Sequence, residues 1–257
     1  ESDTEVLLEL LIAHGTEVVK ELCGIFAFAF YDKNQNDVTL CRDRHGIKPL
    51  YVHQSEGSFI FASEIKAITE IKGYTEIDEE CVSEQIAFGY VAGERTLIKG
   101  IRRLLPGHIH HISTLSGEIN ISDYTSILAG GDTEILSLDE TLENAIDSQM
   151  ISDVPVGVML SGGLDSSIVS SVVAKNYPRL KAFTIKVGKK KYDETSYAKL
   201  LAENYGLSYN ELEYDFYSID KYLDLLTYYH DEPLRHINSI PIYQITKYAR
   251  DKFGIKV

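Results

Sequence analysis

The chain has 257 residues and a mass of 28.9 kDa, which is enough for two domains of ordinary size. Hydrophobic residues make up 44% and charged residues 25%, as in soluble globular proteins, so the composition excludes a disordered chain, a collagen and a coiled coil. The formal net charge of −14 argues against general binding to a nucleic-acid backbone. No stretch is apolar enough to predict a membrane span.

The cysteines Cys23, Cys41 and Cys81 are odd in number, and no pair has CxxC spacing. We therefore expect neither a disulfide framework nor a zinc site, and the pattern predicts a reducing, cytoplasmic location. The N-terminus lacks the basic start and cleavage site of a signal peptide. Because the first methionine is Met150 and residues 253–257 begin an apolar run, we expect both ends to continue in a longer protein.

The first part of the chain predicts a mixture of helices and paired strands. Ser2 stands three residues before Glu5, ahead of a periodic apolar pattern, so a capping box should open a helix there. The apolar, aromatic-rich run CGIFAFAFY is too short for a typical helix and predicts a buried strand. The further elements expected are a short helix over 16–22, strands over 38–41, 51–52, 59–62 and 108–112, and helices over 63–68 and 78–88.

The segment after this part changes character and becomes rich in Ser, Thr, Gly and Asp. It predicts a linker, so we expect one domain over 1–113, a linker over 114–137 and a second domain over 138–257. The second domain alternates helices and strands, which predicts an open parallel α/β sheet that binds ligands at the carboxyl ends of its strands. Strands are expected over 156–160, 181–187 and 208–212, and helices over 138–150, 166–176, 193–205, 216–229 and 240–252.

The sharpest motif is SGGLDSS at 161–167, which follows the strand VGVML directly and precedes a helix. At such a junction several backbone N–H groups and the helix dipole point to one place, and glycines let a phosphate approach closely. Ser161, Ser166 and Ser167 could add hydroxyl donors. Asp165 would repel a phosphate unless a cation bridged them, and Mg²⁺ is the natural bridge. The simpler alternative is a turn in which Ser and Asp merely cap a helix. No Walker or dinucleotide-binding glycine motif is present.

Several segments carry a resemblance to a known family. SGGLDSS resembles the pyrophosphate loop of ATP pyrophosphatases, and DVPVGVMLSGGLDSSIV resembles the synthetase domain of glutamine-dependent asparagine synthetases. FTIKVG, YDETSYAKLLAENYG, and DEPL with SIPIYQITKYAR resemble later segments of that domain. SDTEVLLEL, CGIFAFAFYD, RDRHGIKPLY and FASEIKAI resemble the second half of a class II glutamine amidotransferase domain.

The resemblance implies a fold for each part of the chain. The first part should be a partial α+β sandwich of the N-terminal-nucleophile hydrolase type, with αββα layers. The second should be a partial α/β open parallel sheet of the ATP pyrophosphatase or adenine nucleotide alpha hydrolase type. The family's nucleophile is an N-terminal cysteine. Residue 1 is Glu1, so no catalytic residue is assigned, and the family's second pyrophosphate loop, SGxGxDE, is expected beyond Val257.

The resemblance also implies roles for individual residues. Asp3 would hold the α-amino group of glutamine, and Ile25 and Ile47 would line an ammonia channel. Asp165 would bind Mg²⁺. The residues implied to bind ATP are Leu160, Ser161, Gly162, Gly163, Asp165, Ser166 and Ile185.

These roles have structural alternatives. Asp3 could be an ordinary residue at a helix start, and the isoleucines could be plain core residues. Residues 42–44 could be a charged turn with internal ion pairs, Cys23 a small core residue, and the basic run 189–191 a solvated loop.

The implied activity is that of a glutamine-hydrolysing asparagine synthetase, a carbon–nitrogen ligase. ATP would adenylate aspartate with release of pyrophosphate, and ammonia from glutamine would then form the amide. The implied partners are glutamine, ATP with Mg²⁺, and aspartate or another carboxylate, without nucleic acid or membrane. A homodimer is an assembly that the resemblance allows.

Three other functions stay open. The chain could amidate another carboxylate, such as a sugar acid in surface polysaccharide synthesis, because residues 234–236 differ from the family's usual neighbours. It could form an intramolecular amide, as a β-lactam synthetase does. It could also be a non-catalytic module that binds nucleotide or glutamine, although such a module needs no pyrophosphate site.

Overall fold

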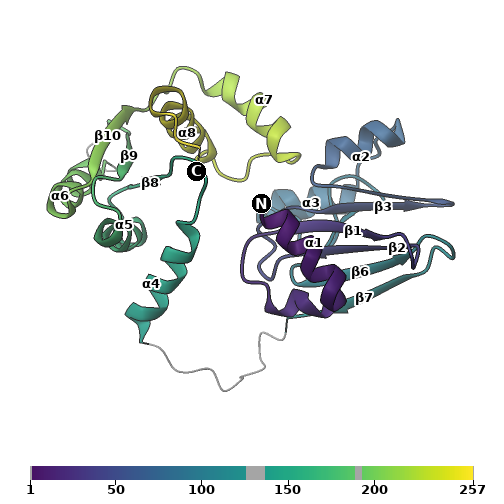
Figure 1. The fold of residues 1–257 in the computed structure, drawn as a ribbon. Coiled ribbons are helices and arrows are strands. Elements are labelled where there is room, and N and C mark those ends of the chain that lie inside the picture. The colour runs from purple at the N-terminus through teal and green to yellow at the C-terminus, as the bar shows by residue number, and fades with distance from the viewer. Residues whose placement is uncertain (1, 126–136, 189–192, 257) are drawn as a thin grey trace. The chain divides into compact units, whose positions relative to one another are not determined.

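The computed structural model describes residues 2–125, 137–188 and 193–256 (Figure 1). The chain divides into two compact units, Glu1–Gly131 and Asp132–Val257. We call them the first and the second unit. No helix within the described ranges has both the length and the apolar character needed to cross a membrane.

The first unit contains two antiparallel sheets, in the strand orders β1-β2-β6-β7 and β4-β3-β5. Helices precede the first strand and lie between β4 and β5. The elements are α1 (Asp3–His14), a 3₁₀ helix (Gly15–Glu21), β1 (Ala27–Asp32), β2 (Asp37–Arg42), β3 (Tyr51–Ser55), β4 (Ser58–Ala62), α2 (Ile65–Lys72), α3 (Glu79–Phe88), β5 (Ile101–Arg103), β6 (His108–Ser113) and β7 (Ile119–Asp123).

The buried side chains show that the first unit has four layers. Successive residues of a strand point to opposite faces, so β2 contributes to two separate cores. Leu40 packs against Val52 between the sheets, whereas Cys41 packs with Leu11 beneath α1. On the outer face of the second sheet, Ile68 of α2 packs in a third cluster. The order helix, sheet, sheet, helix agrees with the αββα arrangement that the resemblance implies.

The start of the first unit follows the prediction except at one strand. The Ser2 hydroxyl caps α1 by accepting the N–H of Glu5 at 3.2 Å, as predicted. The strand expected from residue 23 begins only at Ala27. Gly24 has a φ of 157°, a conformation that side-chain-bearing residues rarely adopt, so the extended run is interrupted there. The expectation that Cys23 is a core residue is therefore wrong, because it is exposed.

The linker expected over 114–137 is wrong at its beginning. β7 pairs antiparallel with β6 within this segment, so the first unit continues past residue 113. Four of the five residues of β7 are exposed, and an edge strand with so little burial has the composition of a loop. Residues 126–136 of the expected linker lie outside the described part of the chain.

The second unit is built on a parallel sheet in the strand order β10-β9-β8, with helices between and after the strands. This confirms the alternating pattern read from the sequence. The elements are α4 (Leu138–Gln149), β8 (Gly157–Met159), α5 (Leu164–Asn176), β9 (Lys181–Lys186), α6 (Thr195–Tyr205), β10 (Ser208–Glu213), α7 (Ile219–His230) and α8 (Ser239–Phe253).

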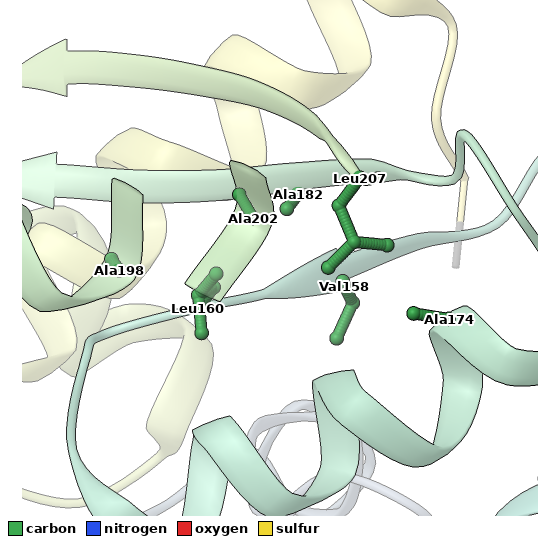
Figure 2. Close-up of a cluster of buried hydrophobic side chains, with 7 residues drawn as sticks. All are labelled: Val158, Leu160, Ala174, Ala182, Ala198, Ala202 and Leu207. Carbon is green, nitrogen blue, oxygen red and sulfur yellow. The ribbon is translucent and has the colours of Figure 1, made fainter. Parts of the chain in front are cut away.

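Both faces of this sheet are covered by helices. Figure 2 shows the cluster on the face that carries α5 and α6, where Ala182 of β9 meets Ala198 and Ala202 of α6. These small side chains let α6 lie close to the sheet. On the other face, Phe183 packs with Ile245 and other residues of α8. The loops that leave the carboxyl ends of the strands therefore start from a rigid, two-sided core.

Candidate functional site

The glycine-rich loop lies between β8 and α5, as the sequence predicts. Gly163 is the N-cap of α5, which starts at Leu164, two residues earlier than expected. Asp165 therefore stands in the first helical turn. The N–H groups of a first turn have no acceptor within the helix, and the helix dipole makes this end positive. The junction thus offers main-chain donors and a positive potential, which suit an anionic ligand.

The first glycine of the loop is required by a close main-chain contact. Gly162 has a φ of 92°, and a Cβ built on it would lie 2.4 Å from the carbonyl oxygen of Glu194. A Cβ on Gly163 would lie 3.3 Å from the hydroxyl oxygen of Ser161 and 3.6 Å from Oε2 of Glu194. The start of α6 therefore packs directly on the loop. The sequence reading did not assign Glu194 to the site, because nothing local connects it with residues thirty positions earlier.

Two of the three serines expected to be donors for a ligand are bonded inside the loop. The hydroxyl oxygens of Ser161 and Ser166 lie 2.8 Å apart. The Ser166 hydroxyl donates to the carbonyl of Gly163 at 3.1 Å, and the N–H of Gly163 donates to the Ser161 hydroxyl at 3.2 Å. These bonds hold the shape of the loop, so the main-chain N–H groups of the first helical turn are the donors best placed for a ligand.

The apolar residues expected at the nucleotide belong to the framework. Leu160 is fully buried, its N–H donates to the carbonyl of Phe183 at 2.9 Å, and its own carbonyl accepts the Thr184 hydroxyl at 2.6 Å. Ile185 is half-buried and packs against the cluster beneath α8. Leu160 therefore joins the loop to β9, and a direct contact of either residue with a nucleotide remains a prediction.

The fit of a divalent cation rests on Asp165, which is exposed at the loop. The described residues contain no group of three or more His, Cys, Asp or Glu side chains able to hold a metal ion by themselves. Mg²⁺ keeps several waters and commonly binds through one or two carboxylates together with phosphate oxygens. An exposed carboxylate beside an anion-binding turn fits that mode of binding.

The segment before α6 is held by its own carboxylate. Asp193 accepts the Thr195 hydroxyl at 2.6 Å and the Thr195 N–H at 3.1 Å. These two hydrogen bonds, the hydroxyl first, lower the pKa of Asp193 below its ordinary value. They also orient Glu194, which lies between the two residues. The basic run 189–191 lies outside the described residues.

In the first unit, the loop after β2 is organised around a buried carboxylate. Asp43 is 1% exposed and accepts the N–H groups of His45 at 3.0 Å, Ile47 at 3.1 Å and Lys48 at 3.0 Å. Burial by itself would raise the pKa of Asp43, but the hydrogen bonds from the backbone outweigh it and lower the pKa. The loop is thus closed around one negative charge.

The neighbouring guanidinium completes this loop. Arg42 donates from Nε to the carbonyl of Lys48 at 2.7 Å, from Nη2 to that of Gly46 at 2.6 Å and from Nη1 to that of Leu104 at 2.5 Å. The expected internal ion pair is wrong for Arg42 and Asp43. The carboxylate and the guanidinium are each satisfied by main-chain groups, which makes the loop rigid.

The two residues expected at an ammonia channel lie at the same end of the β1–β2 pair. Ala27 pairs with Arg42, so the loops before β1 and after β2 are neighbours. Ile25 is 44% exposed and Ile47 is 56% exposed. Neither belongs to the core of the first unit, which excludes the alternative of plain core packing there. Lining of a channel remains a prediction for both.

Asp3 is the first residue of α1 and is exposed, and its carboxylate accepts the N–H of Thr4 at 2.7 Å. A carboxylate in a first turn is favoured by the helix dipole, so this geometry agrees with the simple reading of an ordinary helix start. Among the described residues, no hydrogen bond is made to the other carboxylate oxygen, Oδ2. Binding of an amino group there remains a prediction.

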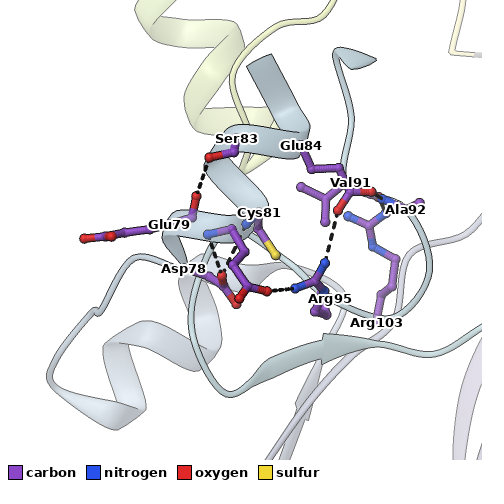
Figure 3. Close-up of polar contacts among 10 residues, drawn as sticks. Asp78, Glu79, Cys81, Ser83, Glu84, Val91, Ala92, Arg95 and Arg103 are labelled. Atoms are coloured by element: carbon purple, nitrogen blue, oxygen red, sulfur yellow. Dashed lines mark hydrogen bonds and ion pairs between the residues drawn. The ribbon is translucent and has the colours of Figure 1, made fainter. Parts of the chain in front are cut away.

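A second network of polar contacts, around α3, has a structural role (Figure 3). Arg95 pairs with Glu80 at 2.9 Å and with Glu84 at 3.3 Å, and Glu84 accepts the N–H of Ala92 at 2.8 Å. Arg103 donates to the carbonyl of Val91 at 3.0 Å. These bonds tie α3 to the segment that follows it. Exposed ion pairs of this kind contribute little stability individually.

Comparison with known proteins gives two family matches in chain order. Residues 1–125 match the glutamine amidotransferase domain, and residues 137–257 match asparagine synthase. A putative glutamine-hydrolysing asparagine synthetase from Methanocaldococcus jannaschii is 31% identical over 261 residues, covering 97% of this chain and 50% of that protein. Asparagine synthetase 1 of Bacillus subtilis is 31% identical over 258 residues, covering 97% of this chain and 40% of that protein.

A fungal protein gives a shorter match. The amidase chyE of Penicillium rubens is 33% identical over 182 residues, covering 67% of this chain and 26% of that protein. The chain thus spans half or less of the length of each of these relatives. The two domain matches occur in the order expected from the sequence motifs. The chain therefore belongs to the glutamine amidotransferase domain family over residues 1–125 and to the asparagine synthase family over residues 137–257.

Proposed function

We propose that this chain is part of a glutamine-dependent asparagine synthetase. In this proposal ATP activates the side-chain carboxylate of aspartate, and ammonia released from glutamine converts the activated carboxylate into an amide. The observation that carries the proposal is the glycine loop at the N-terminus of α5, in a segment that matches the asparagine synthase family. The similarity of the whole chain to proteins named asparagine synthetases supports it.

The loop supplies the chemistry of the second unit. The main-chain N–H groups of Leu164, Asp165 and Ser166 would bind phosphate oxygens of ATP, with Gly162 and Gly163 allowing the close approach. A carboxylate oxygen of aspartate would attack the α-phosphorus, and the bond to the oxygen that bridges to the β-phosphate would break. The N–H groups would then stabilise the negative charge that develops on the departing pyrophosphate.

Asp165 would hold Mg²⁺ beside the polyphosphate, together with phosphate oxygens and water. When bound, Mg²⁺ supplies positive charge that balances the polyphosphate. Ser161 and Ser166 would act through the shape of the loop, because their hydroxyls bond to each other and to Gly163. Leu160 and Ile185 would support the nucleotide site from the core, next to the ends of β8 and β9.

The first unit would contribute to the use of glutamine. Asp3 would bind the α-amino group of glutamine, and the exposed Ile25 and Ile47 would offer apolar surface along the path of ammonia. An apolar wall neither protonates ammonia nor holds it by hydrogen bonds. No residue of this chain is assigned as the nucleophile. All three cysteines are unpaired, which supports the cytoplasm as the proposed compartment.

The same chemistry with a different acceptor carboxylate is the second candidate. It is motivated by Leu234, Arg235 and His236, which differ from the neighbours that the resemblance to asparagine synthetases leads us to expect there. The two candidates share the activation of a carboxylate by ATP. They differ only in which acid supports the reaction.

The experiment that tests the proposal is the exchange of radiolabelled pyrophosphate into ATP by the intact protein. Exchange should require Mg²⁺ and aspartate, and mass spectrometry should identify asparagine when glutamine is added. Asp165→Asn should reduce exchange by about tenfold or more, because one charge-assisted ligand of the cation is lost. Exchange that depends on another acid, but not on aspartate, would select the second candidate. No exchange with any acid would contradict both.

A further inference from the structure

Glu194 lies beside both glycines of the loop, with two different parts of the residue. Its carbonyl oxygen and its Cβ would lie 2.4 Å and 3.1 Å from a Cβ on Gly162, and its carboxylate Oε2 would lie 3.6 Å from a Cβ on Gly163. The same carbonyl accepts the N–H groups of Tyr197 at 3.0 Å and Ala198 at 3.2 Å, so it is fixed at the start of α6. The position of Glu194 relative to the loop is therefore set by main-chain packing.

The carboxylate of Glu194 has no structural task in the described part of the chain. Glu194 is the N-cap of α6, yet its side chain makes no capping hydrogen bond, and it has no ion-pair partner among the described residues. Asp193 accepts the Thr195 N–H instead. The carboxylate thus lies exposed beside Gly163, at the edge of a loop whose main-chain donors suit an anion.

A carboxylate in this place changes the affinity of the loop for a polyphosphate. Whether it lowers or raises that affinity depends on the presence of a divalent cation. Without a divalent cation it repels a polyphosphate held by the loop. With Mg²⁺ present, a second carboxylate oxygen near the loop favours the cation–polyphosphate complex, because Mg²⁺ binds through one or two carboxylates plus phosphates. Asp165 stands in the first turn of α5 and Glu194 is the N-cap of α6, so the two acids belong to the starts of different helices.

We propose that Glu194 is a second carboxylate of the nucleotide site, which acts with Asp165 to make binding of the polyphosphate depend on a divalent cation. The inference rests on the proposed function, since it requires that the loop binds ATP. It adds a residue from the β9–α6 junction to a site otherwise formed by the β8–α5 junction. Glu194 would contact Mg²⁺ directly or through a water of its shell.

The test compares the affinity for ATP of the intact protein in EDTA and in excess Mg²⁺, measured by isothermal titration calorimetry. Glu194→Gln keeps the size and removes the charge. It should bind ATP about three- to tenfold more tightly in EDTA and about three- to tenfold more weakly in Mg²⁺, because a repulsion and a cation ligand are lost together. Glu203→Gln is the matched control, an exposed glutamate on the same helix, and should change neither affinity.

The outcomes separate this inference from the proposed function. Tighter binding of ATP by Glu194→Gln in EDTA together with weaker binding in Mg²⁺ supports the role of Glu194, because a purely structural change would weaken both affinities alike. Equal weakening, equal tightening or no change in Glu194→Gln would overturn it. Asp165→Asn provides the reference: if it loses Mg²⁺-dependent binding while Glu194→Gln does not, only the inference about Glu194 fails. If the parent protein does not bind ATP in either condition, the proposed function fails as well.

Discussion

The buried hydroxyl of Thr184 donates to the carbonyl of Leu160 across 2.6 Å. Thr184 is 2% exposed and Leu160 is 0% exposed, so neither group reaches water. The bond joins the middle of β9 to the last residue before the glycine loop. It fixes where β8 ends and therefore where the loop begins.

Replacing this hydroxyl should destabilise the second unit and disturb the loop. Thr184→Val keeps the shape of the side chain but leaves the Leu160 carbonyl buried without its donor, at a cost of about 1–3 kcal/mol in the free energy of unfolding. Chemical denaturation measures this loss, and Thr184→Ser, which keeps the hydroxyl, should recover most of it. Equal stability of Thr184→Val and the parent would show that the hydrogen bond makes no net contribution to the free energy of unfolding.

A Cβ at Gly162 should be far more harmful than one at another glycine with positive φ. Gly162→Ala must adopt an unfavourable conformation and also displace the Glu194 carbonyl, whereas the new Cβ of Gly188→Ala, at a φ of 73°, meets no atom of a described residue within 4 Å. We expect Gly188→Ala to lower the free energy of unfolding by about 1–2 kcal/mol, from the backbone conformation alone, and Gly162→Ala to lower it by clearly more. Thermal unfolding compares the two. Similar losses of stability would mean that the start of α6 can move away from the loop at little cost in free energy.

The loop closed around Asp43 should make the stability of the first unit depend on pH. The folded-state pKa of Asp43 is lowered, so its contribution is present above the unfolded pKa of about 3.9 and is lost as the pH falls through the folded pKa. Asp43→Asn should therefore destabilise the unit at neutral pH, by about 1–3 kcal/mol, and flatten its acid transition. Denaturation between pH 2 and 7 measures this. Glu56→Gln, at an exposed position, is the control. If the stability of Asp43→Asn depended on pH in the same way as that of the parent, the prediction would be contradicted.

The proposed role of Ile47 can be tested without unfolding the protein. Since Ile47 is 56% exposed in the first unit, Ile47→Asp should leave the thermal unfolding of that unit nearly unchanged. If its surface guides ammonia, the variant should release more glutamate for each amide formed, while ammonia added to the solution restores synthesis. Ile71→Asp, at a 68% exposed position of α2, is the matched control. An unchanged ratio of glutamate to amide in Ile47→Asp would remove the channel assignment.

Much of the architecture follows from local sequence patterns. The alternation of helices and strands after residue 138 determined the parallel sheet, because each apolar run is too short to be anything but a buried strand between helices. The glycine loop is also a local feature, since a strand, two glycines and a helix are contiguous in the chain. Ser2 as the cap of α1 and Gly206 as the end of α6, where φ is 71°, are likewise local effects.

Other features were decided only by tertiary structure. β7 has the composition of a loop and becomes a strand because the edge of β6 offers hydrogen-bond partners. The charges of Arg42 and Asp43 suggest an ion pair, yet both are satisfied by carbonyl and N–H groups that the folded loop brings to them. Glu194 reaches the glycine loop only because β9 lies beside β8 and places α6 over it. Local propensity cannot specify contacts between residues far apart in the chain, because they depend on which strands pair.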